Sequence, residues 1–134
     1  MRAIDLPPFA AAITAGVAAI MTSHTIYAGL DPYIPATLSK KILTELLRSD
    51  LGYDGLVITD DLEMGAIERE QPLAVAALQA LVAGADLLLI CHDHAKVHTA
   101  YETVVASMEK GILANEQLQK SITRIAEVRR RFAY

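Results

Sequence analysis

The sequence predicts an α/β fold built on a small parallel sheet. Three short apolar runs, at residues 17–22, 55–59 and 87–90, are separated by segments in which apolar residues recur at helical spacing. Short, fully apolar strands that alternate with helices are typical of repeated β-α-β units with helices on the sheet. Hydrophobic residues make up 53% of the chain and aromatic residues only 5%, which fits aliphatic strands buried on both faces.

The first half of the chain begins with a helix that two consecutive prolines open and Gly16 ends. Proline at the start and glycine at the end are the usual helix boundaries. The strand at 17–22 and an irregular loop over 25–35 follow. A second helix starts at Leu38, with apolar and charged residues on opposite sides, and ends at Gly52 before the second strand.

The second half of the chain contains three more helices around the third strand. An alanine- and leucine-rich helix runs from Pro72 to Gly84, and the strand at 87–90 follows it. The last two helices each carry an apolar stripe on one face. The stripe residues are Val97, Tyr101, Val104, Val105 and Met108 in the first helix, and Leu118, Ile122, Ile125 and Phe132 in the second.

The length of the chain indicates one domain over residues 1–134, because no Pro- or Gly/Ser-rich linker divides it. A closed barrel of eight strands needs roughly 250 residues, about twice this length. An open three-stranded parallel sheet leaves two edges and an aliphatic face exposed, which favours association. We therefore expect that the chain is part of a larger fold or completes its sheet with a partner.

The composition excludes several classes of partner. The net charge is −4 and no basic patch is present, so we expect no nucleic acid. The longest apolar run, at residues 9–21, is shorter than a membrane span and is better explained as a helix followed by a strand. A single cysteine, Cys91, excludes an internal disulfide and fits a reducing compartment, so we expect a cytoplasmic protein.

Each predicted strand ends in a polar cluster. His24 follows the first strand, Asp60 and Asp61 follow the second, and His92 follows the third. In parallel α/β folds, sites are built at the carboxyl ends of the strands. The sequence therefore predicts a functional site at this edge of the sheet.

The most informative segment spans residues 46–64 and reads LLRSDLGYDGLVITDDLEM. Two aliphatic residues, a basic residue and an acid are followed by glycine, a hydrophobic strand, Thr59 and Asp60. This arrangement resembles the signature of glycoside hydrolase family 3. In that family the Asp directly after Ser or Thr is the catalytic nucleophile, so the resemblance implies that role for Asp60. Glu63 departs from the pattern, which has a small or short polar residue there.

The resemblance extends to residues 5–24 and 35–39, which are similar to the region around the sixth strand of the family's barrel. The bacterial β-N-acetylhexosaminidase branch is the most similar. This implies the C-terminal part of a (β/α)8 TIM barrel, about strands 6 to 8 with their helices, incomplete as a closed barrel. The implied function is retaining hydrolysis of O-glycosidic bonds, with a carbohydrate substrate that carries terminal N-acetylglucosamine, in peptidoglycan recycling.

The chemistry explains why an aspartate belongs at position 60. A retaining glycosidase needs an ionised carboxylate ~5–5.5 Å from a proton donor, so that it can attack the anomeric carbon. A structural alternative is helix capping, because Asp60 and Glu63 have the spacing of a capping box. Because of the resemblance, we interpret Asp60 as the nucleophile. We interpret Asp61 as a helix cap or as a neighbour that holds the nucleophile in place.

The histidines are weaker candidates. His24 could line the sugar pocket, orient a neighbour, or be a hydrogen-bonded histidine at a strand end. His92 also falls near the expected pocket. His92 and His94 have the H-x-H spacing of some metal sites. However, they flank Asp93, which we expect to cap the following helix, and no further ligand group is evident, so we predict no metal and no cofactor.

Family 3 hexosaminidases take other groups from upstream strands: a Lys-His pair that binds the sugar and an Asp-His dyad that supplies the proton donor. Nothing in this chain matches them. One carboxylate cannot both attack the sugar and protonate the leaving group. We therefore expect that the chain alone is inactive and needs the missing N-terminal half-barrel or self-association.

Two other functions remain open from the sequence. The first is a non-catalytic half-barrel that dimerises or binds sugar. The second is a receiver-like phosphoacceptor domain, since Asp60 and Asp61 form an acidic pair after a strand. That fold also requires a phosphorylated Asp after a later strand and a strand-end Lys, and the third strand here is followed by His92 and Asp93 instead.

Overall fold

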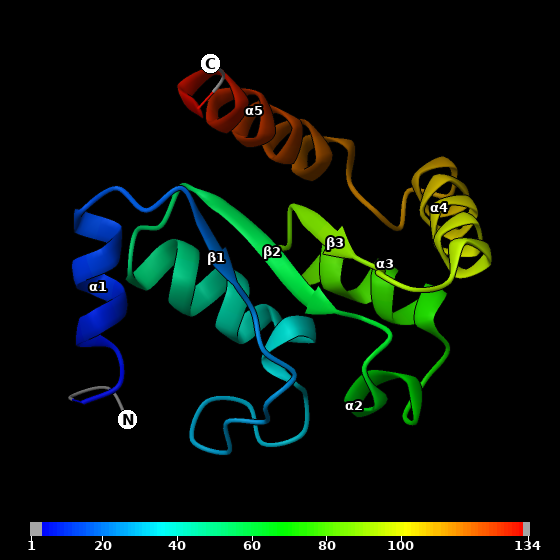
Figure 1. The fold of residues 1–134 in the computed structure, drawn as a ribbon, viewed down its shortest axis with the longest axis horizontal. Helices are drawn as coiled ribbons and strands as arrows, with labels where there is room; N and C mark the ends of the chain where they lie inside the picture. Colours follow the sequence, from blue (N-terminus) through cyan, green and yellow to red (C-terminus); the bar gives the residue numbers. More distant parts are fainter. Residues whose placement is uncertain (1–3, 133–134) are drawn as a thin grey trace.

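The protein has a three-stranded parallel sheet in the order β1-β2-β3 (Figure 1). It is seen in a computed structural model that describes residues 4–132. The strands are β1 (Ala19–Met21), β2 (Leu56–Asp61) and β3 (Leu87–Leu89). The predicted α/β class with a parallel sheet is confirmed. Strands adjacent in the chain are adjacent in the sheet, and β1 and β3 each have one open edge.

Helical segments precede, connect and follow the strands. They are α1 (Pro7–Thr14), η1 (Ala36–Leu38), η2 (Lys41–Asp50), α2 (Gly65–Glu68), α3 (Leu73–Ala83), α4 (His94–Glu109) and α5 (Asn115–Phe132). Within residues 4–132, none of them combines the length and the apolar character needed to cross a bilayer.

The helix predicted to start at Leu38 is divided in two. A short 3-10 turn, η1, ends before Ser39, whose backbone is extended, and the π-helix η2 follows. Ser39 is buried, donates a hydrogen bond to the Asp31 carboxylate at 2.7 Å and accepts one from the Ile42 N–H at 3.3 Å. The buried serine thus interrupts the helix, which periodicity alone did not predict.

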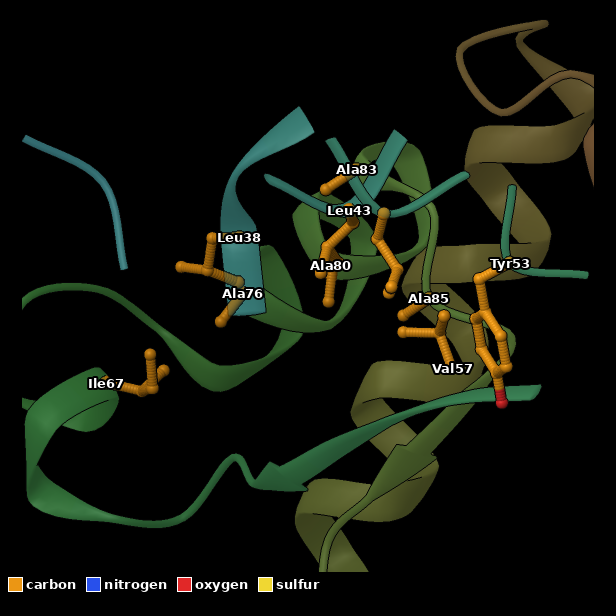
Figure 2. Close-up of a cluster of buried hydrophobic side chains, with 10 residues drawn as sticks. Leu38, Leu43, Tyr53, Val57, Ile67, Ala76, Ala80, Ala83 and Ala85 are labelled. Atoms are coloured by element: carbon orange, nitrogen blue, oxygen red, sulfur yellow. The ribbon is translucent and has the colours of Figure 1, made fainter. Parts of the chain in front are cut away.

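The main core lies between the sheet, η2 and α3 (Figure 2). Val57, the second residue of β2, is fully buried against leucines of η2 and alanines of α3. The residues of this buried cluster are Leu38, Leu43, Leu47, Tyr53, Val57, Ile67, Ala76, Ala80, Ala83 and Ala85. The small alanine side chains let α3 approach the sheet closely. This packing holds β2, the strand that carries Asp60, from one side.

A close backbone approach explains one glycine of the turn before β2. A Cβ at Gly55 would lie 2.4 Å from the Tyr53 hydroxyl oxygen. That hydroxyl donates a hydrogen bond to the Leu56 carbonyl at 2.9 Å, and the tyrosine is buried. Glycine is therefore required at position 55 because the tyrosine ring occupies the space of a side chain.

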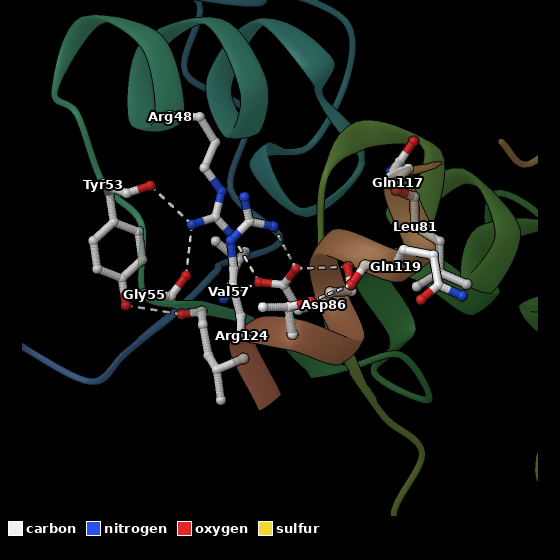
Figure 3. A network of polar contacts seen from close by, with 12 residues as sticks. Arg48, Tyr53, Gly55, Val57, Leu81, Asp86, Gln117, Gln119 and Arg124 are labelled. Carbon is white, nitrogen blue, oxygen red and sulfur yellow. Dashed lines mark hydrogen bonds and ion pairs between the residues drawn. The ribbon is translucent and has the colours of Figure 1, made fainter. Parts of the chain in front are cut away.

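Asp86, just before β3, is the centre of a polar network at the end of the sheet where the strands begin (Figure 3). Its side chain is only 1% exposed. The carboxylate accepts hydrogen bonds from Arg48 at 2.6 Å, Arg124 at 3.1 Å, the Ser121 hydroxyl at 2.7 Å and the Val57 N–H at 2.9 Å. These contacts join η2, α5, β2 and β3, so one buried carboxylate connects four elements.

The predicted helices α4 and α5 are present, but their apolar stripes are largely not buried. Tyr101 is 66% exposed and Ile122 is 56% exposed. The residues that α4 and α5 do bury are small: Ala100, Ser107 and Ser121. Helix α4 packs closely on α3 at the open edge of the sheet, and α5 is fixed through the Asp86 network. Both arrangements leave the larger apolar side chains on the surface.

Candidate active site

The polar strand ends meet at one edge of the sheet, as predicted. Asp60 and Asp61 are the last two residues of β2. His24 and His92 both approach Asp61: the His24 Nε2 lies 2.8 Å from its carbonyl oxygen, and the His92 Nε2 lies 3.2 Å from its carboxylate oxygen. The structure therefore brings together the four residues singled out in the sequence, with Asp61 in the middle.

A β-bulge lies at Asp60. The pairing of β2 with β3 changes register between Ile58 and Asp61, so that two residues, Thr59 and Asp60, lie opposite Leu88 alone. The Thr59 hydroxyl, which is fully buried, accepts the Leu89 N–H at 2.9 Å and takes the place of a backbone acceptor. A bulge re-aims the side chain next to it.

Asp60 itself is partly exposed, and one carboxylate oxygen accepts the N–H of Asp61 at 2.9 Å. Val57, three residues earlier, is buried in the cluster formed with η2 and α3. At Asp60 the bulge interrupts the regular alternation of side chains, and Asp60 is left partly exposed. The carboxylate is therefore accessible to an approaching molecule.

Asp61 does not cap a helix. The next helix, α2, begins at Gly65 after Met64, too far along the chain for Asp61 to be its N-cap. One oxygen of the carboxylate accepts the Glu63 N–H at 3.1 Å, and the other faces His92. Its side chain is 17% exposed. Asp61 thus stabilises the turn after β2 and contacts the loop after β3.

Glu63 connects the same two loops, and it does not form a capping box with Asp60. Its carboxylate accepts the His92 N–H at 2.6 Å and the Asp93 N–H at 3.2 Å, and it lies 3.4 Å from the Lys96 ammonium. Its side chain is only 5% exposed. Burial raises the pKa of this carboxyl, but the two backbone N–H groups and Lys96 outweigh burial, so the pKa lies below the ordinary value of a glutamate. The residue that departs from the family pattern therefore orders the His92 loop.

We expect that Glu63→Gln loosens the loop after β3. The amide retains the shape of Glu63 but removes the charge that strengthens the two backbone hydrogen bonds. Amide hydrogen exchange of His92 and Asp93 should accelerate several-fold, while amides in α3 exchange as before. Unchanged exchange at these two positions would show that the contact does not order the loop.

The pH dependence of the same contact follows from the lowered pKa of Glu63. A carboxyl with a lowered pKa in the folded state stabilises the fold above its unfolded pKa, and this contribution is lost as the pH falls through the folded value. Protection of the His92 amide should therefore persist as the pH falls to the ordinary pKa of a glutamate, about 4.3, and be lost only below it. Loss of protection already above that pH would contradict the assignment.

The two histidines have different environments. The His24 ring is half-buried and both of its nitrogens are hydrogen-bonded, with Nδ1 2.8 Å from the Thr37 hydroxyl. The His92 side chain is 77% exposed. Asp93 caps α4, as predicted, by accepting the Ala95 N–H at 2.8 Å.

Cys91 is a residue of this edge to which the sequence analysis gave no role. It directly precedes His92 and is exposed. Partial desolvation, followed by the negative charges of Asp61, Glu63 and Asp60, raises the pKa of its thiol. The thiol is therefore protonated at neutral pH and is a weak nucleophile.

The chain matches a known protein family over nearly its whole length. The model of the glycosyl hydrolase family 3 N terminal domain matches residues 1–128. A β-hexosaminidase of Nitrosomonas eutropha is 43% identical over 89 residues, which are 66% of this chain and 25% of that protein. A protein of Arthroderma benhamiae named as an uncharacterized secreted glycosyl hydrolase is 37% identical over 134 residues, 99% of this chain and 38% of the relative.

Solved structures of family 3 enzymes have the same fold. The β-N-acetylglucosaminidase of Paenibacillus sp. FPU-7 superposes with a TM-score of 0.92 at 40% identity, covering 94% of this chain and 24% of that one. The β-N-acetylglucosaminidase of Thermotoga maritima superposes with a TM-score of 0.87 at 34% identity, covering 97% of this chain and 29% of that one. The chain thus spans well under half the length of these relatives. The family match leaves no place for a receiver-like domain, and the chain belongs to glycoside hydrolase family 3.

Proposed function

We propose that this chain forms strands 6 to 8 of a (β/α)8 barrel and supplies the nucleophile of a retaining glycoside hydrolase. The consecutive order of three parallel strands is that of a barrel wall. The observation that carries the function is the carboxylate of Asp60. It lies partly exposed at the carboxyl end of the central strand, in a bulge.

The proposed reaction has two steps. The Asp60 carboxylate attacks the anomeric carbon while the bond to the leaving-group oxygen breaks and an acid protonates that oxygen. A glycosyl ester forms on Asp60. Water, deprotonated by the same acid–base group, then attacks the anomeric carbon and releases the sugar with retained configuration.

The neighbouring carboxylates do not supply the acid. A general acid must hold a proton at the working pH, which requires a raised pKa. The pKa of Glu63 is lowered instead, and its carboxylate is occupied by two backbone N–H groups. The Asp61 carboxylate accepts a hydrogen bond from the Glu63 N–H and faces His92. We infer that the proton donor comes from outside this chain and that the chain alone does not hydrolyse glycosides.

A companion half of the barrel is the partner that fits the exposed surface. Met21, on the open edge of β1, is 57% exposed. Beside it, an apolar pocket of about 600 Å³ lies between α1, β1 and η2 and includes Phe9 and Leu46 in its lining. A further parallel strand paired with β1 would cover this edge, and its side chains would fill the pocket. The companion half would also bring the proton donor to Asp60.

The proposed substrate is a carbohydrate with terminal β-linked N-acetylglucosamine, of the kind released in peptidoglycan recycling. The β-hexosaminidase and β-N-acetylglucosaminidase relatives support this class. A cytoplasmic location belongs to the same proposal and rests on the single cysteine. Because the Arthroderma relative is named as secreted, fractionation of the native cells is the measurement that decides the location.

We expect no release of nitrophenol from an aryl N-acetyl-β-glucosaminide by the purified 134-residue chain. A chimera in which this chain replaces the matching segment of the Paenibacillus enzyme should hydrolyse the same substrate. The β-anomer of the product should appear first in proton NMR spectra, as retention requires. Activity of the isolated chain would refute the need for a companion, and an inactive but folded chimera would refute the proposed function.

The alternative is a non-catalytic half-barrel, which the exposed apolar edge also favours. Light scattering and calorimetry on the isolated chain separate the two. A stable dimer that binds N-acetylglucosamine without turnover, together with an inactive chimera, would support the non-catalytic function. A chain that binds no sugar until it is part of the chimera would support the enzyme.

A further inference from the structure

The His24 side chain bridges the ends of two neighbouring strands. Backbone hydrogen bonds join β1 to β2 as far as the Thr22 N–H, which donates to the Ile58 carbonyl at 2.8 Å. Three residues farther along β2, the His24 Nε2 lies 2.8 Å from the carbonyl oxygen of Asp61. A side chain thus continues the connection between the strands up to the residue that follows Asp60.

The partners of the ring determine its tautomer. A carbonyl oxygen can only accept a hydrogen bond, so the Nε2 of His24 must carry the proton that it shares with Asp61. In the neutral ring Nδ1 is then an acceptor, and the Thr37 hydroxyl donates to it at 2.8 Å. The Thr37 oxygen in turn accepts from the Thr22 hydroxyl at 2.7 Å. The three hydrogen bonds therefore all point the same way, from the Thr22 hydroxyl through Thr37 and His24 to the Asp61 carbonyl.

The network is well placed to fix the ring. Thr37 is fully buried and Thr22 is 9% exposed, so both hydroxyls depend on protein partners. Thr37 belongs to η1, which is packed against α3. The His24 ring is therefore held between the packed η1 turn and the end of β2.

We propose that His24 is a positioning residue for the nucleophile. By donating to the Asp61 carbonyl, which also accepts the Met64 N–H at 3.1 Å, it helps to fix the peptide that joins Asp61 to Leu62, and with it the direction of the adjacent Asp60 carboxylate. The buried hydroxyls of Thr22 and Thr37 hold the ring in the Nε2–H tautomer. This inference rests on the proposed role of Asp60, and it assigns His24 no contact with the sugar.

The tautomer is tested directly on the 134-residue chain. Long-range proton–nitrogen correlation spectra recorded at about pH 8, above the ordinary histidine pKa, distinguish the two neutral tautomers. We expect the Nε2–H pattern for His24, whereas the exposed His94 should show an average of both tautomers. An Nδ1–H or averaged pattern for His24 would overturn the proposal.

Two substitutions test the positioning. In His24→Gln the amide nitrogen can occupy the place of Nε2 and donate to the Asp61 carbonyl, whereas the shorter His24→Asn cannot reach it. The Leu62 amide resonance should shift in the Asn variant and remain near its original position in the Gln variant. In the active chimera, Asn should lower kcat roughly tenfold to a hundredfold with KM changed by less than about threefold, and Gln should restore most of kcat.

The outcomes separate this inference from the proposed function. If the chimera is inactive, the proposed function fails, and the tautomer and the Leu62 resonance still decide whether His24 fixes the peptide. If Gln and Asn lower kcat equally, or if both act only on KM, His24 does not position the nucleophile. If the Asn variant does not fold, the tautomer of the unsubstituted chain and the kcat of the Gln variant remain as tests.

Discussion

Asp60→Asn is expected to lower kcat of the chimera by roughly 10⁴-fold, because a neutral amide cannot form the glycosyl ester. The substitution is close to isosteric. The Asn side-chain oxygen can still accept the Asp61 N–H that Asp60 accepts at 2.9 Å, so the end of β2 should keep its shape. Steady-state rates with an aryl N-acetyl-β-glucosaminide measure the loss. Circular dichroism and the melting temperature should show an intact fold.

The neighbouring residue provides the matched control. Asp61→Asn removes an adjacent carboxylate whose contacts are with the Glu63 N–H and His92. It should lower kcat much less than Asp60→Asn does. The exposed Asp54, on the turn before β2, serves as a second control that should have no effect when changed to Asn. If Asp60→Asn retained normal turnover, or if Asp61→Asn were the more damaging change, the nucleophile would be assigned to the wrong residue.

Asp86→Asn is expected to destabilise the isolated chain by about 3–5 kcal/mol, enough to unfold a marginally stable domain. The carboxylate, 1% exposed, neutralises Arg48 and Arg124, whose side chains are 12% and 21% exposed. Burial lowers the pKa of Arg48 while Asp86 raises it, and arginine remains charged at neutral pH. Removing the carboxylate charge therefore leaves two largely buried cations without compensation. Urea denaturation followed by circular dichroism measures the change.

A double-mutant cycle identifies the cause of this loss. If the uncompensated charge is responsible, Arg48→Met combined with Asp86→Asn should be less destabilised than the sum of the two single variants. Asp54→Asn, at an exposed position, should change the free energy of unfolding by less than about 0.5 kcal/mol. Additive effects of Arg48→Met and Asp86→Asn would show that the pair is not coupled.

The location of the site followed from the strand pattern. Apolar runs that end in polar residues predicted that His24, Asp61 and His92 would meet, and they do. This worked because parallel strands place their carboxyl ends at one edge whatever the details of packing. The family could also be recognised from the long pattern around β2.

The burial of the last two helices was not predictable in the same way. Periodicity marks which residues of a helix are apolar, but not which surface they face. Tyr101 and Ile122 are exposed because the residues that pack inward are the small Ala100 and Ser121.

By itself, the sequence determined the α/β class, the family and the position of Asp60 at a strand end, since all three depend on local pattern and spacing. Only the tertiary structure decided how that carboxylate is held. Four features hold it: the bulge, the Thr59 hydroxyl that replaces a backbone acceptor, the contact of His24 with Asp61 and the contact of Glu63 with His92. Each joins residues more than 25 positions apart in the chain. Such contacts depend on the register between strands and on the direction of side chains. The periodicity of apolar residues reveals neither the register nor the side-chain directions. These contacts are therefore seen only in the folded structure, where the strand ends come together.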